Sequence, residues 1–450
     1  MRLTLPEPDF TPGDKGFDDK DATGLPYDLL GRKAVGRRLS DLVERIEEPL
    51  VIALDGNWGS GKSHFLRLWT GAHRKENDGR ARVIYFDAFE HDYLDDPLVG
   101  LVGAILQEPG ERPWRDAALH KVKSAASKLL RPAAKIGLAL ATAGASELVA
   151  SSLDPLMQAT EDEAEKAIDA LWAKEASRKQ AMQDFRKALA ELAKDGTGNP
   201  QKLVFIVDEL DRCRPDYGLS LLEVIKHFFT VPNVHFVLGV NLMALENCVR
   251  VRYGESTDSA QYLQKFLHAK ISFPKIRTLK SEDTATLRYL RAISERMDID
   301  REIAQEICVL LGTMTMRRDI NLREIQRIFF YAALLPTDLK HMPYATRAVL
   351  IGGIFLKVLK SNTYEGLKNR DRYVSGHDVM TGLEVVAWDN ESAYPEAVRF
   401  YSFWNSLVHF QASGMESFHI DFGGSNHVPQ DPRKWLSDTL TEFLETFTLP

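Results

Sequence analysis

Residues 56–63 read GNWGSGKS and place three glycines, a lysine and a hydroxyl group within eight positions. A short apolar run at residues 50–54 precedes them, and Phe65, Leu66 and Trp69 follow at helical spacing. The pattern G-x-x-x-x-G-K-[ST] between a strand and a helix is that of a phosphate-binding loop, because glycines let backbone N–H groups approach phosphate oxygens closely. The order of strand, loop and helix favours this interpretation over a glycine turn that precedes a lysine by chance.

The motif assigns a role to the polar side chains of the loop. Lys62 reaches the β- and γ-phosphates of a nucleotide, and the Ser63 hydroxyl coordinates Mg²⁺. Trp58 contributes its backbone, so its ring is free to turn outward and pack elsewhere. We predict ATP and Mg²⁺ as cofactors, and a nucleotide-binding set that comprises Gly56, Asn57, Trp58, Gly59, Ser60, Gly61, Lys62, Ser63 and His64.

Two carboxylates, Asp208 and Glu209, follow five consecutive apolar residues at positions 203–207. Such a run is typical of a central strand in a parallel sheet, where ligands bind at the carboxyl ends. Asp208 is then placed to hold Mg²⁺ through water, opposite Ser63, and Glu209 to orient or deprotonate an attacking water. The alternative is that the two acids only begin a loop.

Further polar residues near the predicted sheet edge have two interpretations each. Arg212 and Arg214 either stabilise transition-state charge, in their own subunit or a neighbouring one, or pair with Asp211 and Asp216. Asn241, after the predicted strand 234–240, either binds the attacking water or forms a turn. A cluster of four arginines either sends one member to the phosphates from a lid or forms a solvated basic face, which is the more common case: Arg317, Arg318, Arg323 and Arg327. The predicted catalytic set is Lys62, Asp208, Glu209, Arg212 and Asn241.

Strand-like and helix-like segments alternate along the first part of the chain. Further short apolar runs at residues 82–88 and 234–240, with helical patterns between them, predict an α/β fold with a doubly wound, mostly parallel sheet. The expected organisation is an extended N-terminal arm at 1–27, a nucleotide-binding core at 28–277 with a helical insertion at about 108–197, a helical lid at 278–345, and a mainly helical region at 346–450.

Composition narrows the class of protein. A net charge of −7 and a pI near 6.0 give no strong signal for nucleic-acid binding. Three widely separated cysteines suggest reduced thiols and a cytoplasmic location. The most apolar part of the insertion, residues 136–150, contains Glu147 and relies on Ala and Gly, so we do not expect it to span a membrane. A buried or self-associating helix is favoured there over contact with a membrane surface.

The motifs in order resemble the KAP family of P-loop NTPases. The similar segments are GNWGSGKS, VIYFDAFEHDYLDDP, LVFIVDELDRC, VHFVLGVNL, YLQKFLHAKISFPKI and NLREIQRIF, with DLLGRKAVGRRLSDL upstream, and they cover about residues 28–335. The resemblance implies that Lys62 and Ser63 act at the phosphate and Mg²⁺, that Asp208 acts at Mg²⁺, and that Asp211 and Arg212 are the family's extra pair. The family often has Asp where this chain has Glu209 and Asn241, so the individual hydrolytic roles rest on the residues themselves.

The leading functional hypothesis is a Mg²⁺-dependent ATPase whose nucleotide state drives conformational change or assembly, with a second copy or a partner protein. The resemblance implies a regulatory or defensive role, such as bacterial anti-phage defence. The alternative is a nucleotide-gated scaffold that binds ATP with negligible turnover. A small-molecule kinase is less favoured because Glu209 follows Asp208, and a DNA translocase because a basic stripe with aromatics is missing.

Overall fold

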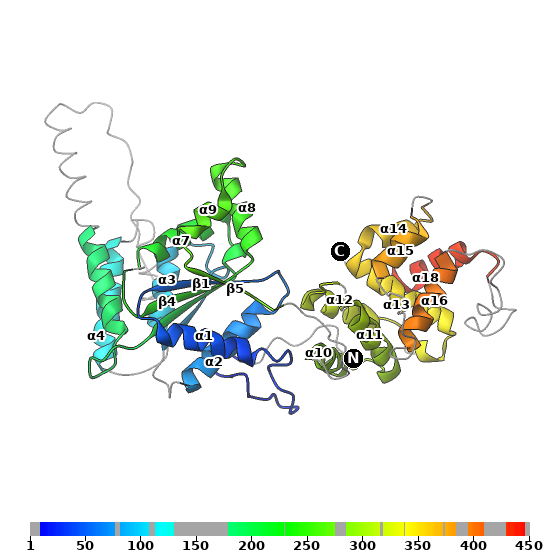
Figure 1. Cartoon of the computed structure of the whole chain (residues 1–450), viewed down its shortest axis with the longest axis horizontal. Coiled ribbons are helices and arrows are strands. Elements are labelled where there is room, and N and C mark those ends of the chain that lie inside the picture. Colours follow the sequence, from blue (N-terminus) through cyan, green and yellow to red (C-terminus); the bar gives the residue numbers. More distant parts are fainter. Residues whose placement is uncertain are drawn as a thin grey trace, which may run out of the picture.

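The computed structural model forms an α/β lobe and a helical lobe (Figure 1). It describes residues 10–76, 82–107, 113–129, 179–228, 230–274, 285–315, 318–336, 338–371, 374–383, 395–408 and 429–445. Two features singled out in the sequence, the apolar segment 136–150 and Arg317, lie outside these residues. No helix in the described part of the chain is long and apolar enough to cross a membrane.

The α/β lobe is built on a parallel sheet of five strands in the order β2-β3-β4-β1-β5. The strands are β1 (Leu50–Asp55), β2 (Arg82–Asp87), β3 (Leu203–Asp208), β4 (Val234–Val240) and β5 (Ala269–Ser272). The two central strands β3 and β4 are buried along their whole length, as expected for their continuous apolar runs. The predicted strands are confirmed, and β5 is an additional strand within the segment YLQKFLHAKISFPKI.

Helices cover both faces of the sheet, which confirms the predicted doubly wound α/β fold. One face packs against α1 (Lys33–Arg45) and α2 (Lys62–Glu76) through residues such as Leu39 and Trp69. The other face packs against α3 (Pro97–Gln107), α4 (Pro113–Leu129), α7 (Pro215–Lys226) and α8 (Leu242–Tyr253). Successive strand residues alternate between the two cores: Phe205 joins the second core and Ile206 the first.

The insertion between the two nucleotide motifs is helical where the structure describes it. Helix α4 and the helical residues 179–192 pack together through alanines and larger side chains, among them Val122 and Phe185, and extend the core of the second sheet face. The described part of the insertion is therefore joined to the α/β lobe by a shared hydrophobic core.

The N-terminal segment differs from the extended arm predicted for residues 1–27. Residues 10–27 form turns that pack on α2, with Phe10 and Phe17 buried and the Phe17 ring 5.5 Å from the Phe65 ring. Gly71 allows this contact, because a Cβ atom there would lie 2.3 Å from the carbonyl oxygen of Lys15. Buried aromatic side chains, together with ion pairs of Asp19 with Lys75 and of Asp21 with Arg296, hold this polar segment against the rest of the chain.

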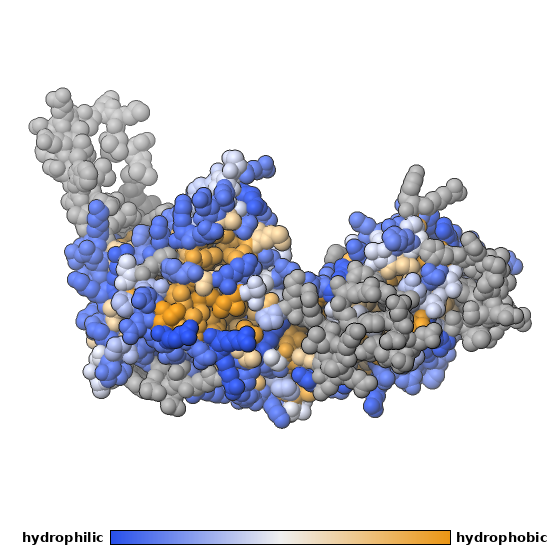
Figure 2. All heavy atoms as spheres, viewed as in Figure 1, coloured by the Kyte–Doolittle hydropathy of each residue, from blue (hydrophilic) through white to orange (hydrophobic). Residues whose placement is uncertain are grey.

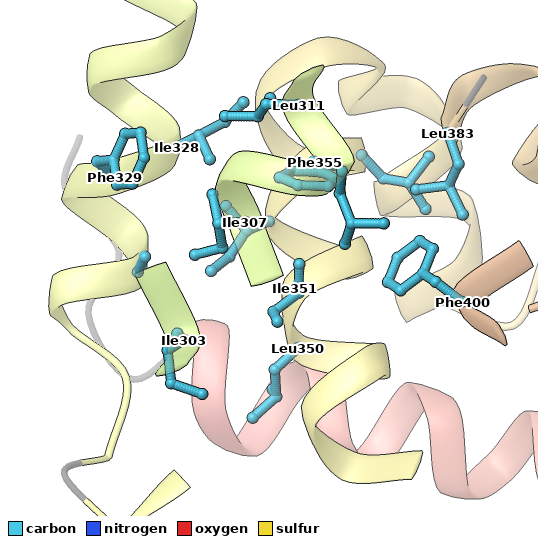
Figure 3. Packing of buried hydrophobic residues seen from close by; sticks show 14 of the residues in the cluster. Ile303, Ile307, Leu311, Ile328, Phe329, Leu350, Ile351, Phe355, Leu383 and Phe400 are labelled. Carbon is cyan, nitrogen blue, oxygen red and sulfur yellow. The ribbon is translucent and has the colours of Figure 1, made fainter. Parts of the chain in front are cut away.

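The buried hydrophobic residues that the structure describes in the helical lobe form one cluster (Figure 3). Its helices are α10 (Ala285–Arg296), α11 (Arg301–Met314), α12 (Leu322–Ala333), α13 (Tyr344–Leu359), α14 (Ser361–Lys368), α15 (Gly376–Leu383), α16 (Pro395–Val408) and α18 (Pro432–Leu444). The cluster joins Ile307 and Ile328 of the predicted lid to Phe355 and Phe400 of the predicted C-terminal region. The boundary predicted between residues 345 and 346 is corrected, because it falls inside the buried helix α13.

Hydrophobic residues gather on the face of the α/β lobe that Figure 2 shows. They lie over the sheet, in the area between α1 and α7 of Figure 1. The edge strand β5 has only four residues, and its Lys270 pairs with Asp55 at 2.8 Å. A short edge strand that carries a charge is poorly suited to pair with another strand.

Close packing in the helical lobe predicts a stability effect at Gly352. A Cβ atom at this position would lie 2.5 Å from the Trp404 ring, whose indole N–H donates to the Ala348 carbonyl at 3.1 Å. Gly352→Ala is expected to lower the free energy of unfolding by about 1–3 kcal/mol in urea titrations, because a rigid buried ring has to move. The control is Gly103→Ala on α3, where the added Cβ meets no atom within 4 Å. An unchanged free energy in Gly352→Ala would contradict the packing described here.

Candidate nucleotide-binding site

Residues 56–61 connect β1 to α2 and have the backbone geometry that their glycines permit. Gly59 and Gly61 have φ angles of 74° and 85°, in the left-handed region. Both also allow close approach: a Cβ at Gly59 would lie 2.8 Å from Asn321 Oδ1, and one at Gly61 would lie 2.8 Å from Leu322 Cδ1. The loop therefore needs glycine both for its shape and for contact with the start of α12.

Several donors hold the carbonyl groups of the loop. Arg32 donates to the Ser60 carbonyl at 2.7 Å, and the Leu322 N–H donates to the Gly59 carbonyl at 2.8 Å. The Lys62 ammonium donates to the Gly56 carbonyl and, at 3.2 Å, to that of Asn57. With these carbonyls bonded to the protein, the opposite side of the loop is left to present N–H groups to an anion.

Arg32 was not predicted from the sequence. It lies just before α1, is buried, stacks over the Phe273 ring at 4.2 Å and also donates to the Pro274 carbonyl at 3.3 Å. Burial lowers its pKa to about 10. Only its place in the upstream segment DLLGRKAVGRRLSDL indicated that this part of the chain belongs to the site.

The Lys62 side chain is buried among carboxylates. Burial lowers the pKa of its ammonium group, and the nearby Asp211 and Asp208 oppose this effect. Because Lys62 bonds to neutral loop carbonyls, its charge is available to a phosphate group that enters the cavity.

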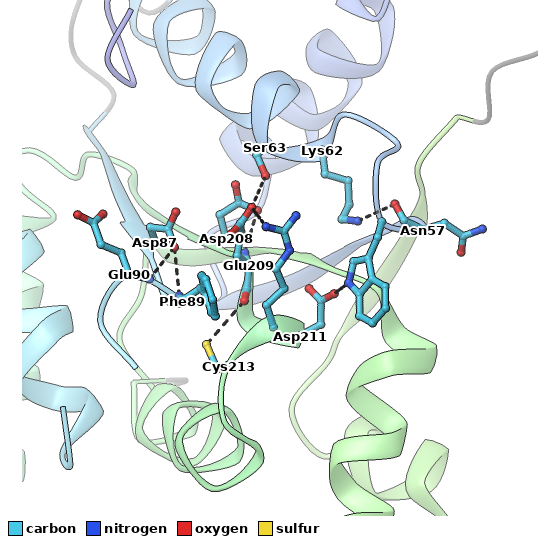
Figure 4. A network of polar contacts seen from close by, with 12 residues as sticks. Asn57, Lys62, Ser63, Asp87, Phe89, Glu90, Asp208, Glu209, Asp211 and Cys213 are labelled. Atoms are coloured by element: carbon cyan, nitrogen blue, oxygen red, sulfur yellow. Dashed lines mark hydrogen bonds and ion pairs between the residues drawn. The ribbon is translucent and has the colours of Figure 1, made fainter. Parts of the chain in front are cut away.

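Asp208, Ser63 and Glu209 meet at the carboxyl end of β3 (Figure 4). Asp208 is buried and accepts hydrogen bonds from the Tyr85 hydroxyl at 2.6 Å and from the Glu209 N–H at 2.9 Å. Burial raises the pKa of its carboxyl group, although these donors and Ser63 act against the shift. The Ser63 hydroxyl also lies 3.5 Å from Glu209 Oε1.

Glu209 is held in an unusual conformation. Its φ of 58° places it in the left-handed region, at the start of the short 3₁₀ helix η1 (Leu210–Arg212). Its carboxylate forms an ion pair with Arg212 at 2.7 Å. Burial raises the pKa of the Glu209 carboxyl group. The positive charge of Arg212 acts against this shift. The sequence left open whether Arg212 pairs with Asp211 or Asp216; its partner is Glu209.

Trp58 links the phosphate loop to the turn after β3. Its ring is 47 % exposed, but the indole N–H donates a hydrogen bond to the buried Asp211 carboxylate (Figure 4). The ring thus turns outward from the loop, as the sequence allowed, and its contact with Asp211 also anchors the loop. No sequence signal indicated this pair beyond the resemblance that marked Asp211.

Arg214 and Asn241 lie beside the site. Arg214 turns away and donates to the Asp92 carbonyl at 3.0 Å and to the Leu94 carbonyl at 3.3 Å. Asn241 is buried at the N-cap position of α8, where its side chain makes no capping hydrogen bond. Among the described residues, neither belongs to the set that lines the cavity.

A cavity of about 720 Å³ extends from the phosphate loop to the helical lobe. Besides Lys62, Ser63, Asp208 and Glu209, it is lined by residues that the sequence did not indicate: Asp21, Ala22, Thr23, Tyr27, Tyr289 and Arg296. Residues of the segments DLLGRKAVGRRLSDL and NLREIQRIF line it as well: Asp28, Leu29, Leu30, Leu322 and Gln326. His64 also lines it and bonds to the Tyr27 carbonyl at 2.9 Å, while burial lowers the pKa of its ring.

The cluster of arginines in the lid divides into different roles. Arg323 lines the cavity and is close enough to Glu209 to stabilise its charged form. Arg318 donates to the Leu359 carbonyl at 3.0 Å within the helical lobe, and Arg327 is exposed. One member of the cluster thus faces the cavity from the lid.

The residues present fit a magnesium site. Among the described residues no group of three or more His, Cys, Asp or Glu side chains could hold a metal ion. Magnesium bound beside a nucleotide needs only one or two protein oxygens and keeps several waters. Ser63 and Asp208 offer such oxygens, and a divalent charge would also offset the raised pKa of the buried carboxyl group.

A parallel sheet with a glycine-rich phosphate loop after β1 and a buried carboxylate at the end of β3 defines a P-loop nucleotide-binding domain. The model of the KAP family P-loop domain matches residues 32–333, and the chain belongs to this family. Among curated proteins no sequence matches.

Solved structures with detectable likeness include Cdc6p from Pyrobaculum aerophilum, with 12% identity and a TM-score of 0.37 over 95% of this chain and 97% of that one. The ORC2 protein of Aeropyrum pernix with ADPNP and ADP has 11% identity and a TM-score of 0.33 over 84% and 94% of the chains. Its ORC1 protein in complex with DNA has 15% identity and a TM-score of 0.32 over 93% and 97%. Likeness at this level carries no information on function.

The burial of Asp208 predicts a gain of stability when its charge is removed. Its raised pKa means that the native state holds a proton to higher pH than the unfolded chain, so ionisation lowers stability as the pH rises. Asp208→Asn, without divalent ions, is expected to raise the free energy of unfolding at pH 7 by about 0.5–2 kcal/mol. The gain should shrink as the pH falls towards about 4.

Urea titrations across this pH range provide the measurement. Asp41→Asn, at an exposed position on α1, serves as the control and should change stability by less than about 0.5 kcal/mol. A less stable Asp208→Asn variant at pH 7 would show that the carboxylate is needed structurally.

Proposed function

We propose that the protein is a Mg²⁺-dependent ATPase that uses ATP binding and hydrolysis to drive conformational change or assembly. The observation that carries the proposal is the meeting of Lys62, Ser63, Asp208 and Glu209 at one end of a single cavity. These groups supply a cation for phosphate, oxygens for the metal and a carboxylate for water.

The size of the cavity and the residues at its far end support a nucleotide as the ligand. The volume of the whole cavity lies within the range of about 300–1,000 Å³ typical of small-molecule sites. Leu29, Leu30 and Tyr289 offer surfaces for a base, while the Gln326 amide, which lies 3.4 Å from the Tyr289 hydroxyl, offers polar atoms. The family and this geometry support a nucleotide; adenine is the proposed base.

In the proposed mechanism Lys62 exchanges the carbonyls of Gly56 and Asn57 for phosphate oxygens. Ser63 and Asp208 would hold Mg²⁺, which when bound would offset charge on the phosphates. Glu209, once released from Arg212, accepts a proton from the attacking water, and Arg212 is then free to stabilise phosphate charge. Asn241, at the end of β4, lies outside the lining of the cavity, so this mechanism gives it no contact with the water.

Helix α12 of the lid connects the phosphate loop to the helical lobe. This helix bonds to the phosphate loop through Leu322 and brings Arg323 to the cavity, while Ile325 and Phe329 are buried in the core of the helical lobe. A shift of the loop on nucleotide binding would move this core. The cytoplasmic location and a role in anti-phage defence rest on the thiols and on the family resemblance, respectively.

A scaffold with negligible turnover is the second candidate, and one contact favours it. The ion pair with Arg212 neutralises Glu209 and keeps its left-handed turn closed. A chain that never breaks this pair would bind ATP without activating water.

Replacing Lys62 tests nucleotide binding. Lys62→Ala leaves phosphate charge uncompensated in a buried loop, so ATP affinity measured by calorimetry in Mg²⁺ should fall at least tenfold, or about 1.4 kcal/mol. Lys33→Ala, which removes an ion pair with the exposed Asp18 outside the cavity, is the control and should leave affinity unchanged. Equal affinities in both variants would refute the assignment.

Glu209→Gln separates the two candidate functions. The amide keeps the size of the side chain but accepts no proton, so turnover should fall about a hundredfold or more while ATP stays bound. Phosphate release and ATP affinity are measured together, with Glu48→Gln at an exposed position before β1 as the control. If the wild type binds ATP but has no turnover for the variant to lose, the scaffold is supported.

A further inference from the structure

Helix α12 presents one side to the cavity, and Gln326 lies on that side. Leu322, Arg323 and Gln326 all line the cavity, at the three- and four-residue spacing that places side chains on one face of a helix. The start of the helix is fixed at the phosphate loop, because the Leu322 N–H donates to the Gly59 carbonyl at 2.8 Å. With a rise of about 1.5 Å per residue, Gln326 lies about 6 Å farther along the helix. Its side chain therefore lines the part of the cavity beyond the phosphate loop.

The Tyr289 hydroxyl orients the amide of Gln326. Gln326 Nε2 donates to this hydroxyl at 3.4 Å, which is longer than most N–H···O hydrogen bonds. Tyr289 is buried on α10, and burial raises the pKa of its hydroxyl to about 12, so the group stays neutral. An amide that is oriented by one weak contact can exchange it for stronger bonds to a ligand at little cost.

The carboxylates that the N-terminal segment brings to the cavity already have donors. Asp21 Oδ1 accepts from the N–H groups of Thr23 at 2.9 Å and of Leu25 at 3.0 Å. Its Oδ2 pairs with Arg296 at 2.5 Å, so this cation has a partner as well. Asp28 accepts from two backbone N–H groups at the start of α1, at 2.8 and 2.9 Å. A guanine base is bound through carboxylates that accept from its N1–H and amino groups, or through a cation at its O6 and N7, and these groups are engaged within the protein.

The chemistry of adenine matches a primary amide. Adenine presents its amino group beside a ring nitrogen that accepts a hydrogen bond. The oxygen of an amide accepts from this amino group while its nitrogen donates to the ring nitrogen, which is the pairing that Gln and Asn side chains make with adenine in DNA. Guanine has a carbonyl oxygen in place of this amino group, so the amide oxygen would face another acceptor. Leu29 and Leu30 line the same cavity and offer apolar contacts to the faces of a purine ring.

We propose that Gln326 selects adenine over guanine, with Oε1 accepting from the amino group of the base and Nε2 donating to the adjacent ring nitrogen. This inference rests on the proposed function, because it assigns the residue that reads the base of the nucleotide bound at the same site. Helix α12 then contacts the nucleotide through Gln326 and the phosphate loop through Leu322, while Ile325 is buried in the core of the helical lobe. Recognition of the base thus acts on a helix that belongs to that lobe.

The test removes the donor of the amide and measures the ratio of two affinities. Calorimetry with non-hydrolysable analogues of ATP and GTP, both with Mg²⁺, should show that the wild type binds the ATP analogue at least tenfold more tightly. Gln326→Glu keeps the size of the side chain but turns an acceptor towards the accepting ring nitrogen of adenine, so this ratio should fall at least tenfold. Gln326→Leu has neither donor nor acceptor and should bring the two affinities within about threefold of each other.

The ratio separates base reading from a structural role, because a disturbed lid would weaken both nucleotides alike. Gln261→Glu, at an exposed position on α9 (Ser259–Gln264) outside the cavity lining, introduces the same charge and is the matched control, which should keep the wild-type ratio.

Three results would overturn the role of Gln326 and leave the phosphate site intact. These are a wild type that binds both analogues within threefold, a Gln326→Glu variant that keeps the wild-type ratio, and an equal loss of both affinities in the two Gln326 variants. A wild type that binds neither analogue would refute the proposed ATPase itself, and the role of Gln326 with it.

Discussion

The site depends on a balance of charge among groups that water barely reaches. The Lys62 ammonium and the carboxylates of Asp208 and Asp211 are all buried at the end of the sheet. Each would be costly alone, and each is retained because the others and a few fixed donors offset its charge. Tyr85, Trp58 and the Glu209 N–H are these donors, and their positions on three different segments tie the segments together.

The same balance makes the site sensitive to an incoming anion. Lys62 is bonded to loop carbonyls and Arg212 to Glu209, so both cations have partners that a phosphate group can replace. The backbone contact between Gly59 and Leu322 places the lid against the loop where this exchange would occur. Because that contact joins two main-chain groups, side-chain substitution cannot easily tune it.

The sequence predicted those features whose physics is local. Five apolar residues before Asp208 are typical of a buried strand, and the glycine spacing of residues 56–61 is typical of a phosphate loop, so the sheet and the loop were predictable. The contacts between distant segments were not. Arg32 lies 28 positions before Ser60, and Trp58 lies 153 positions before Asp211, so no local pattern joins them. Glu209 pairs with Arg212 from a left-handed φ, which residues with a Cβ atom rarely adopt, so the sequence did not indicate this pair either.

The folded N-terminal segment changes where the smallest complete domain begins. A chain shortened to start at residue 28 would keep all five strands, the phosphate loop and both carboxylates of the site. It would lose Phe10 and Phe17 from the core beneath α2, the carbonyl of Tyr27 that holds His64, and the wall of the cavity formed by Asp21 to Thr23. The family match, residues 32–333, therefore leaves out side chains that belong to the core beneath α2 and to the wall of the cavity.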